Sequence, residues 1–233
     1  MKTVLAAIAV LFVTAPAIAG DLPAGFVRLA DIDATIRQDM RYAGSLNFLG
    51  RPAAGYEAPA CILTEEAASA LSRVQARLAA ESLTLVVFDC YRPQRAVDDF
   101  MAWVRGGKGF DARWHPRVSR QRLRAEGYIA GRSGHSRGST VDLAIAGLGR
   151  AAPSDPTCGA MGAATLDFGT GFDCFDDESR TASKAIPAAA RDNRRLLVET
   201  MRAEGFVNYS REWWHFTLAD EPQRKRFDFP VTD

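Results

Sequence analysis

Two of the chain's three histidines stand near other residues that can bind a metal ion. His135 lies in the glycine-flanked segment SGHSRGSTVDL, seven residues before Asp142, and His215 ends the segment EWWH. Two imidazoles and a carboxylate are a ligand set that suits catalytic zinc, which keeps a fourth position open for water. The pattern predicts a zinc site made of His135, Asp142 and His215. The alternative is that each histidine is a structural residue that binds no metal.

Two further charged residues are placed to take part in catalysis. Glu212 precedes His215 by three residues, so its carboxylate could take a proton from a water activated by zinc. Arg92 follows an apolar run and precedes Pro93, which is the kind of strand-to-helix corner where functional residues gather. Its guanidinium could stabilise an oxyanion formed at a peptide carbonyl. The alternative for Arg92 is a buried ion pair with Asp89.

Other polar and aromatic residues have less specific patterns. Asp173 lies in a long loop, where its carboxylate could bind the free amine of a small peptide or could be a helix cap or a solvated acid. Trp213 and Trp214 are expected to pack the strand that carries His215, and one of them could line the pocket. His115, in a polar segment, is expected at the surface.

The elements that must position these residues are read from hydrophobic periodicity. Thr64, as an N-cap before apolar residues at helical spacing, predicts a helix within 63–82. Alternation in the segment GSTVDLAIA predicts a strand in which Asp142 faces away from Val141 and Leu143. Further expected elements are loops over 21–60, a strand at 83–88, helices at 93–104 and 189–205, a short helix around 119–126, a long loop from 149 to 177 and a hairpin of 206–209 with 213–218. Because hairpins outnumber βαβ units, the pattern predicts a single α+β domain.

Length and charge limit the classes of function. The chain of 233 residues is 47% hydrophobic and 24% charged, which is typical of one globular domain. The 29 Lys and Arg residues nearly balance the 28 Asp and Glu residues, so the chain lacks the basic excess that nucleic-acid binding needs. We therefore expect no nucleic-acid partner.

The N-terminal segment predicts export. Residues 1–19 combine one lysine, an apolar run interrupted by Pro16, and a small-residue cleavage site at Ala19, which is typical of a secretory signal peptide. The catalytic domain would then be 20–233, periplasmic or secreted, and no later segment is apolar enough to cross a membrane. Four cysteines in that part favour two disulfides. Three pairings are open, of which Cys158–Cys174 with Cys61–Cys90 is preferred.

Several motifs together closely resemble the zinc D-alanyl-D-alanine dipeptidases of the VanX type. These motifs are SGHSRGSTVDL, EWWHF, YRPQRAV, DMRYAGSLNFLGRP, GTGFDCFDDES and the terminal FDFPV, and the similarity runs from about Asp31 to Val231. The resemblance implies the α+β fold of the wider DD- and LD-peptidase group (Hedgehog/DD-peptidase-like), with a small, mainly antiparallel sheet flanked by helices. It also implies a metallopeptidase that splits D-Ala-D-Ala into free D-alanine.

The resemblance carries over residue by residue. It implies that His135, Asp142 and His215 bind one zinc ion per chain, that Glu212 is the general base and that Arg92 stabilises the transition state. It further implies that Ser133 lies near the substrate carboxylate, and that Asp173 and Tyr42 bind the amino end of the dipeptide.

The sequence departs from the resistance enzymes of this family in two respects. It carries a signal peptide, and its loop between Asp142 and Asp173 is longer and contains Cys158. Exported relatives imply a role in cell-wall turnover or in the use of D-alanine. The alternatives are a DD- or LD-carboxypeptidase acting on muropeptides, and a wall-binding or zinc-storing protein without turnover, which would have no need for Glu212.

Overall fold

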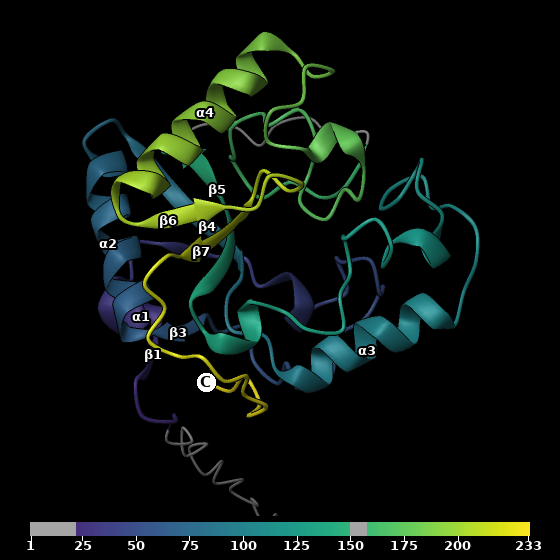
Figure 1. Cartoon of the computed structure of the whole chain (residues 1–233). Helices are drawn as coiled ribbons and strands as arrows, with labels where there is room; N and C mark the ends of the chain where they lie inside the picture. The colour runs from purple at the N-terminus through teal and green to yellow at the C-terminus, as the bar shows by residue number, and fades with distance from the viewer. Residues whose placement is uncertain (1–21, 150–157) are drawn as a thin grey trace, which may run out of the picture.

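A five-stranded sheet forms the centre of the protein (Figure 1). The computed structural model describes residues 22–149 and 158–233, so the predicted signal peptide and eight residues of the long loop lie outside the described residues. The strand order is β2-β4-β5-β7-β6, and only the β2–β4 pair is parallel. The strands of this sheet are β2 (Arg37–Gln38), β4 (Leu83–Asp89), β5 (Thr140–Gly147), β6 (Phe206–Asn208) and β7 (His215–Leu218). The sheet is therefore small and mainly antiparallel, as the fold prediction requires.

Within residues 22–149 and 158–233, a second sheet and four α-helices complete the fold. β1 (Phe26–Arg28) pairs with β3 (Ile62–Thr64) in a two-stranded antiparallel sheet. The helices are α1 (Leu29–Ile32), α2 (Glu65–Ala79), α3 (Gln94–Arg105) and α4 (Ala188–Ala203). Figure 1 shows α2 and α4 on one side of the molecule and α3 on the other. The predicted α+β fold class is confirmed.

Local sequence explains where the helices begin. The side chain of Thr64 accepts a hydrogen bond from the backbone N–H of Ala67, as predicted for an N-cap of α2. α3 begins directly after Pro93, whose fixed φ suits a helix start. The predicted short helix around 119–126 is present only in part, as a single 3-10 turn at Arg120–Arg122. That turn cannot extend to Gly127, which has a positive φ of 81°.

The prediction of a surface position for His115 is wrong. Its exposed fraction is 3%, its Nδ1 lies 3.0 Å from the carbonyl oxygen of Val118, and its ring packs edge-on against Trp103. Trp103 belongs to α3, which ends at Arg105 and lies outside the polar segment around the histidine. Those flanking residues therefore gave no sign of the covering side chain.

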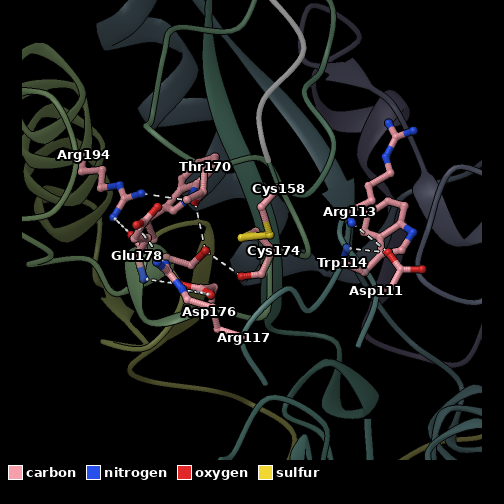
Figure 2. Close-up of a disulfide and its surroundings, with 12 residues drawn as sticks. Asp111, Arg113, Trp114, Arg117, Cys158, Thr170, Cys174, Asp176, Glu178 and Arg194 are labelled. Carbon is pink, nitrogen blue, oxygen red and sulfur yellow. Dashed lines mark hydrogen bonds and ion pairs between the residues drawn. A yellow bond between two sulfur atoms is a disulfide. The ribbon is translucent and has the colours of Figure 1, made fainter. Parts of the chain in front are cut away.

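Both disulfides of the preferred pairing are present. Cys61–Cys90 joins the residue before β3 to the residue after β4, and Cys158–Cys174 closes part of the long loop. Figure 2 shows the second disulfide beside a set of hydrogen bonds that includes Thr170 and Arg194. The first bridge therefore ties the two sheets together, and the second constrains the loop that carries Asp173.

The C-terminal segment folds back on the N-terminal half. Val231 accepts hydrogen bonds from the backbone of Glu57 and Ala58, and Phe229 stacks on Tyr91 with ring centroids 4.0 Å apart. The two ends of the described chain thus share one hydrophobic core. Among the described residues, no helix has the length and apolar character needed to cross a bilayer.

Candidate active site

Strand pairing brings two of the three predicted metal ligands together. Asp142 of β5 and His215 of β7 are direct partners in the antiparallel register, so their side chains lie on the same face. His135 lies on a one-turn 3-10 helix just before β5. The chain then turns at Gly138, whose φ is 87° and where an added Cβ would lie 2.2 Å from the ring of Phe26. Only glycine fits this turn.

The three side chains form a compact cluster. Asp142 Oδ2 lies 3.3 Å from His135 Nε2, and Asp142 Oδ1 lies 3.1 Å from His215 Nδ1. The two imidazole nitrogens are 3.3 Å apart, and one ligand atom from each residue lies within 4.8 Å of the others. His135 and Asp142 are buried, whereas the side chain of His215 is 20% exposed. The cluster can therefore hold a metal ion that remains accessible on the His215 side.

The buried carboxylate of this cluster lacks a hydrogen-bond donor. Oδ1 of Asp142 is fully buried and accepts no hydrogen bond, although an imidazole nitrogen is close. Burial alone would raise the pKa of Asp142, but the nearby charges of His135 and His215 outweigh burial and lower it. Burial lowers the pKa of His215, which favours the neutral imidazole. An ionised carboxylate and a neutral imidazole are the forms that bind metals.

A backbone carbonyl orients His135. Its Nδ1 lies 2.8 Å from the carbonyl oxygen of Cys90 and 3.4 Å from Asp89 Oδ2. A proton on Nδ1 would leave Nε2 free to bind a metal, as in many carboxylate–histidine–metal arrangements. Cys90 is itself held by its disulfide to Cys61. The carbonyl that orients His135 is therefore anchored by a covalent bridge.

Glu212 lies beside the cluster without belonging to it. Its Oε2 is 3.5 Å from His215 Nδ1, and the residue is 7% exposed. Burial raises the pKa of Glu212 well above its ordinary value, and the negative charges of Asp142 and Asp173 add to this effect. A raised pKa makes a carboxylate a stronger base, which suits it to accept a proton and later return it.

Arg92 makes the ion pair that sequence reasoning gave as its alternative, and it also faces the cluster. Its Nη2 lies 2.7 Å from Asp89 Oδ2 and 3.5 Å from Asp142 Oδ2. The guanidinium lies over the rings of Tyr42 and Phe100, 5.0 Å from each centroid. These contacts hold the positive charge at the wall of the site.

Tyr42 and Asp173 meet across the site although 131 residues separate them. The hydroxyl of Tyr42 donates to the Asp173 carboxylate, at 2.9 Å from Oδ2. Burial raises the pKa of Asp173 well above its ordinary value, and the charge of Asp142 contributes to the increase. Asp173 also has a positive φ of 59°, a conformation uncommon for a residue other than glycine. Such strain persists where the surrounding structure holds a side chain in place.

These residues surround one cavity of about 260 Å³. This volume is close to the lower end of the roughly 300–1,000 Å³ of small-molecule pockets, so it suits a small substrate. Trp214 contributes to the wall, while the neighbouring Trp213 is buried in the packing. The predicted site residues that line the cavity are Tyr42, Arg92, Ser133, Asp142, Asp173, Glu212 and His215, and His135 lies just behind it.

Two further residues support the site: Asp89, which sequence reasoning named only as an alternative partner of Arg92, and Tyr56, which it missed. Asp89 is fully buried, binds Arg92 and lies near His135. The hydroxyl of Tyr56 donates to Asp89 Oδ1 at 2.5 Å. The position of Asp89 at the end of a buried strand was a usable signal, whereas no local pattern marks Tyr56.

A His–Asp–His cluster beside a buried glutamate and an arginine, on a small α+β fold, is the arrangement of a metallopeptidase. The sequence model of the D-ala-D-ala dipeptidase family, among the M15 peptidases, matches residues 23–232, and the chain belongs to this family. The family is metal-dependent, and the chain is an enzyme of its peptidase class.

Characterised relatives extend over nearly the whole chain. The D-alanyl-D-alanine dipeptidase of Streptomyces coelicolor is 39% identical over 209 residues, which cover 88% of this chain and 98% of the relative. The enzyme of the same name from Enterococcus faecium is 36% identical over 210 residues, or 89% of this chain and 98% of the relative. That from Escherichia coli is 31% identical and covers 82% of this chain and 83% of the relative.

Proposed function

We propose that this chain hydrolyses the dipeptide D-Ala-D-Ala to free D-alanine, with one zinc ion held by His135, Asp142 and His215. The observation that carries the proposal is the buried His–Asp–His cluster beside Glu212 in a cavity small enough for a dipeptide. The family and the names of its relatives supply the substrate.

The residues of the cluster fit a zinc ion. Two imidazole nitrogens and one carboxylate oxygen are the donor types that catalytic zinc takes. The buried Oδ1 of Asp142 accepts no hydrogen bond, and a cation would satisfy it. When bound, zinc supplies a Lewis acid and lowers the pKa of water.

Glu212 and Arg92 would carry out the proton transfer and charge stabilisation. The Glu212 carboxylate takes the proton of the attacking water and returns it to the leaving amine, a sequence that its raised pKa favours. Arg92, fixed by Asp89 and by two aromatic rings, stabilises the negative charge that develops on the carbonyl oxygen. Because Arg92 is already oriented before substrate binds, it needs little reorganisation during the reaction.

The two ends of the substrate would be held by groups on opposite sides of the scissile bond. Asp173, hydrogen-bonded to Tyr42, binds the free ammonium group. Ser133 binds the carboxylate end, because its Oγ accepts the backbone N–H of His135 and its own O–H stays available to donate. An acyl group in place of the ammonium would leave the buried Asp173 carboxylate with the Tyr42 hydroxyl but without an opposite charge, which disfavours longer stem peptides.

Export is part of the proposal. Two disulfides fit an oxidising compartment. We infer that residues 1–19 are a signal peptide, that the catalytic domain is 20–233 and that the enzyme acts in the periplasm or outside the cell. In that compartment, the reaction would serve cell-wall turnover or the use of D-alanine.

The test is release of D-alanine by purified protein of residues 20–233. Zinc-loaded protein should hydrolyse D-Ala-D-Ala and leave an N-acylated stem peptide ending in the same pair intact. A chelator should abolish the activity, and zinc should restore it. Cleavage of the stem peptide would instead assign a carboxypeptidase, and hydrolysis of neither substrate would refute the proposed function.

A further inference from the structure

We propose that Arg132 recognises the free carboxylate of the substrate and makes the enzyme selective for dipeptides with an ionised C-terminus. The inference rests on the proposed function and adds a specificity-determining residue to it. It starts from the charges around the cavity.

Two arginines line the cavity, and they differ in their ion-pair partners. Arg92 is engaged by Asp89 and lies within 3.5 Å of Asp142. Arg132 lines the same cavity, its side chain is exposed, and it has no ion-pair partner among residues 22–149 and 158–233. Arg132 is therefore the arginine on this wall that is free to pair with an incoming anion.

The remaining charges of the cavity fix which end of a dipeptide Arg132 would meet. Asp173 and Glu212 are acidic, and both are buried. They would attract an ammonium group and repel a carboxylate. A zwitterionic dipeptide would therefore turn its carboxylate away from these acids and toward the cationic and hydroxyl groups of the same lining, which include Arg132 and Ser133.

Arg132 adds a positive charge, which Ser133 lacks. A serine hydroxyl can donate one hydrogen bond but carries no charge, so it distinguishes a carboxylate poorly from an amide. An arginine next to it in the chain adds a charge and a planar pair of donors that match a carboxylate. Arg132 also lines an outer groove together with Arg124, so its charge reaches the solvent and can attract anionic substrates.

The experiment compares D-Ala-D-Ala with its C-terminal amide. In the zinc-loaded parent, the free dipeptide should have a clearly lower KM than the amide. Arg132→Gln should raise the KM of the free dipeptide about three- to tenfold, with kcat nearly unchanged and little effect on the amide. Arg132→Lys, which keeps the charge, should recover part of the difference.

The matched control is Arg124→Gln. Arg124 is exposed and lines the outer groove but not the cavity, so this change should leave the ratio of the two KM values as in the parent. Salt provides a second readout, because added salt should raise the KM of the parent for the free dipeptide more than that of Arg132→Gln.

The outcomes separate the two proposals. If the parent hydrolyses the dipeptide and Arg132→Gln leaves the carboxylate-to-amide ratio unchanged, Arg132 is not the specificity residue and the proposed function stands. If the zinc-loaded parent hydrolyses neither substrate, the proposed function fails and the inference fails with it.

Discussion

Glu212 combines three properties that a proton-transfer group needs: burial, a raised pKa and a position 3.5 Å from His215. Glutamine has nearly the same shape but cannot take up the proton of a water molecule. Glu212→Gln is expected to keep the zinc content of the parent and to lower kcat by about 10²- to 10⁴-fold. Metal analysis and kcat on the same sample give both results. A variant with full turnover would refute the general-base role.

The raised pKa of Glu212 also leads us to expect that the stability of the folded protein depends on pH. The raised pKa of Glu212 means that its folded pKa exceeds the unfolded value of about 4.3. In the metal-free protein, this group therefore contributes stability below about pH 4, and that contribution is lost as pH rises through the folded pKa. Because glutamine does not ionise, the Tm of Glu212→Gln should increase relative to that of the parent as pH rises. Thermal melts of both metal-free proteins at several pH values give the comparison, and a constant Tm difference would contradict it.

The site could be predicted at the residue scale only where its signals are local. The alternation around Val141 and Leu143 predicted that Asp142 lies on the opposite face of the strand, and the structure pairs Asp142 with His215. The contact between Tyr56 and Asp89 spans 33 residues and joins a loop to a strand end, so no periodicity could show it. The roles of the site residues remain predictions that the experiments above address.

At the scale of elements, the two disulfides hold different parts of the site. Cys61–Cys90 holds the carbonyl that orients His135, and Cys158–Cys174 borders Asp173. Replacing either pair by alanine should lower the free energy of unfolding by about 3 kcal/mol.

The two double variants should differ in function. Removing Cys61–Cys90 should weaken zinc binding about 10- to 100-fold, as loss of second-shell support usually does. Removing Cys158–Cys174 should leave zinc affinity near the parent value and raise the KM for the dipeptide. Competition with a zinc chelator, together with steady-state kinetics, measures both effects. Equal zinc affinities in the two variants would show that the Cys61–Cys90 bridge does not contribute to the orientation of His135.

Helices and strands were predicted correctly where a single sequence pattern, a cap or a hydrophobic periodicity, was dominant. The helix after Thr64, the strand at 83–88 and the final hairpin were predicted from caps and periodicity, and α2, β4, β6 and β7 confirm them. The prediction of a helix at 119–126 was only partly correct. The polar residues of this segment allow a longer helix, but Gly127 has a positive φ and Leu123 is buried in the core. Its conformation is set by packing that its own residues do not encode.

At the scale of the whole molecule, a bound metal would connect separate parts of the fold. The ligands come from the 3-10 turn before β5, from β5 and from β7, so zinc should stabilise the folded state. With free zinc at 100 times its Kd, the gain is about 2.7 kcal/mol, and chelation should lower Tm by about 5–10 °C. Calorimetry with and without chelator tests this, and Asp142→Asn should abolish the difference. No shift in the parent would count against the metal site.

The C-terminal segment adds a consequence for the order of events during synthesis. Ribosomes release a chain N-terminus first, yet the backbone of Glu57 and Ala58 donates to Val231, and Phe229 stacks on Tyr91. His215 also lies on one of the last strands to emerge. A nascent chain that has not reached β7 therefore carries two of the three residues of the cluster, and its hydrophobic core still lacks the C-terminal residues that complete it. The site is therefore expected to assemble only after the whole chain has left the ribosome.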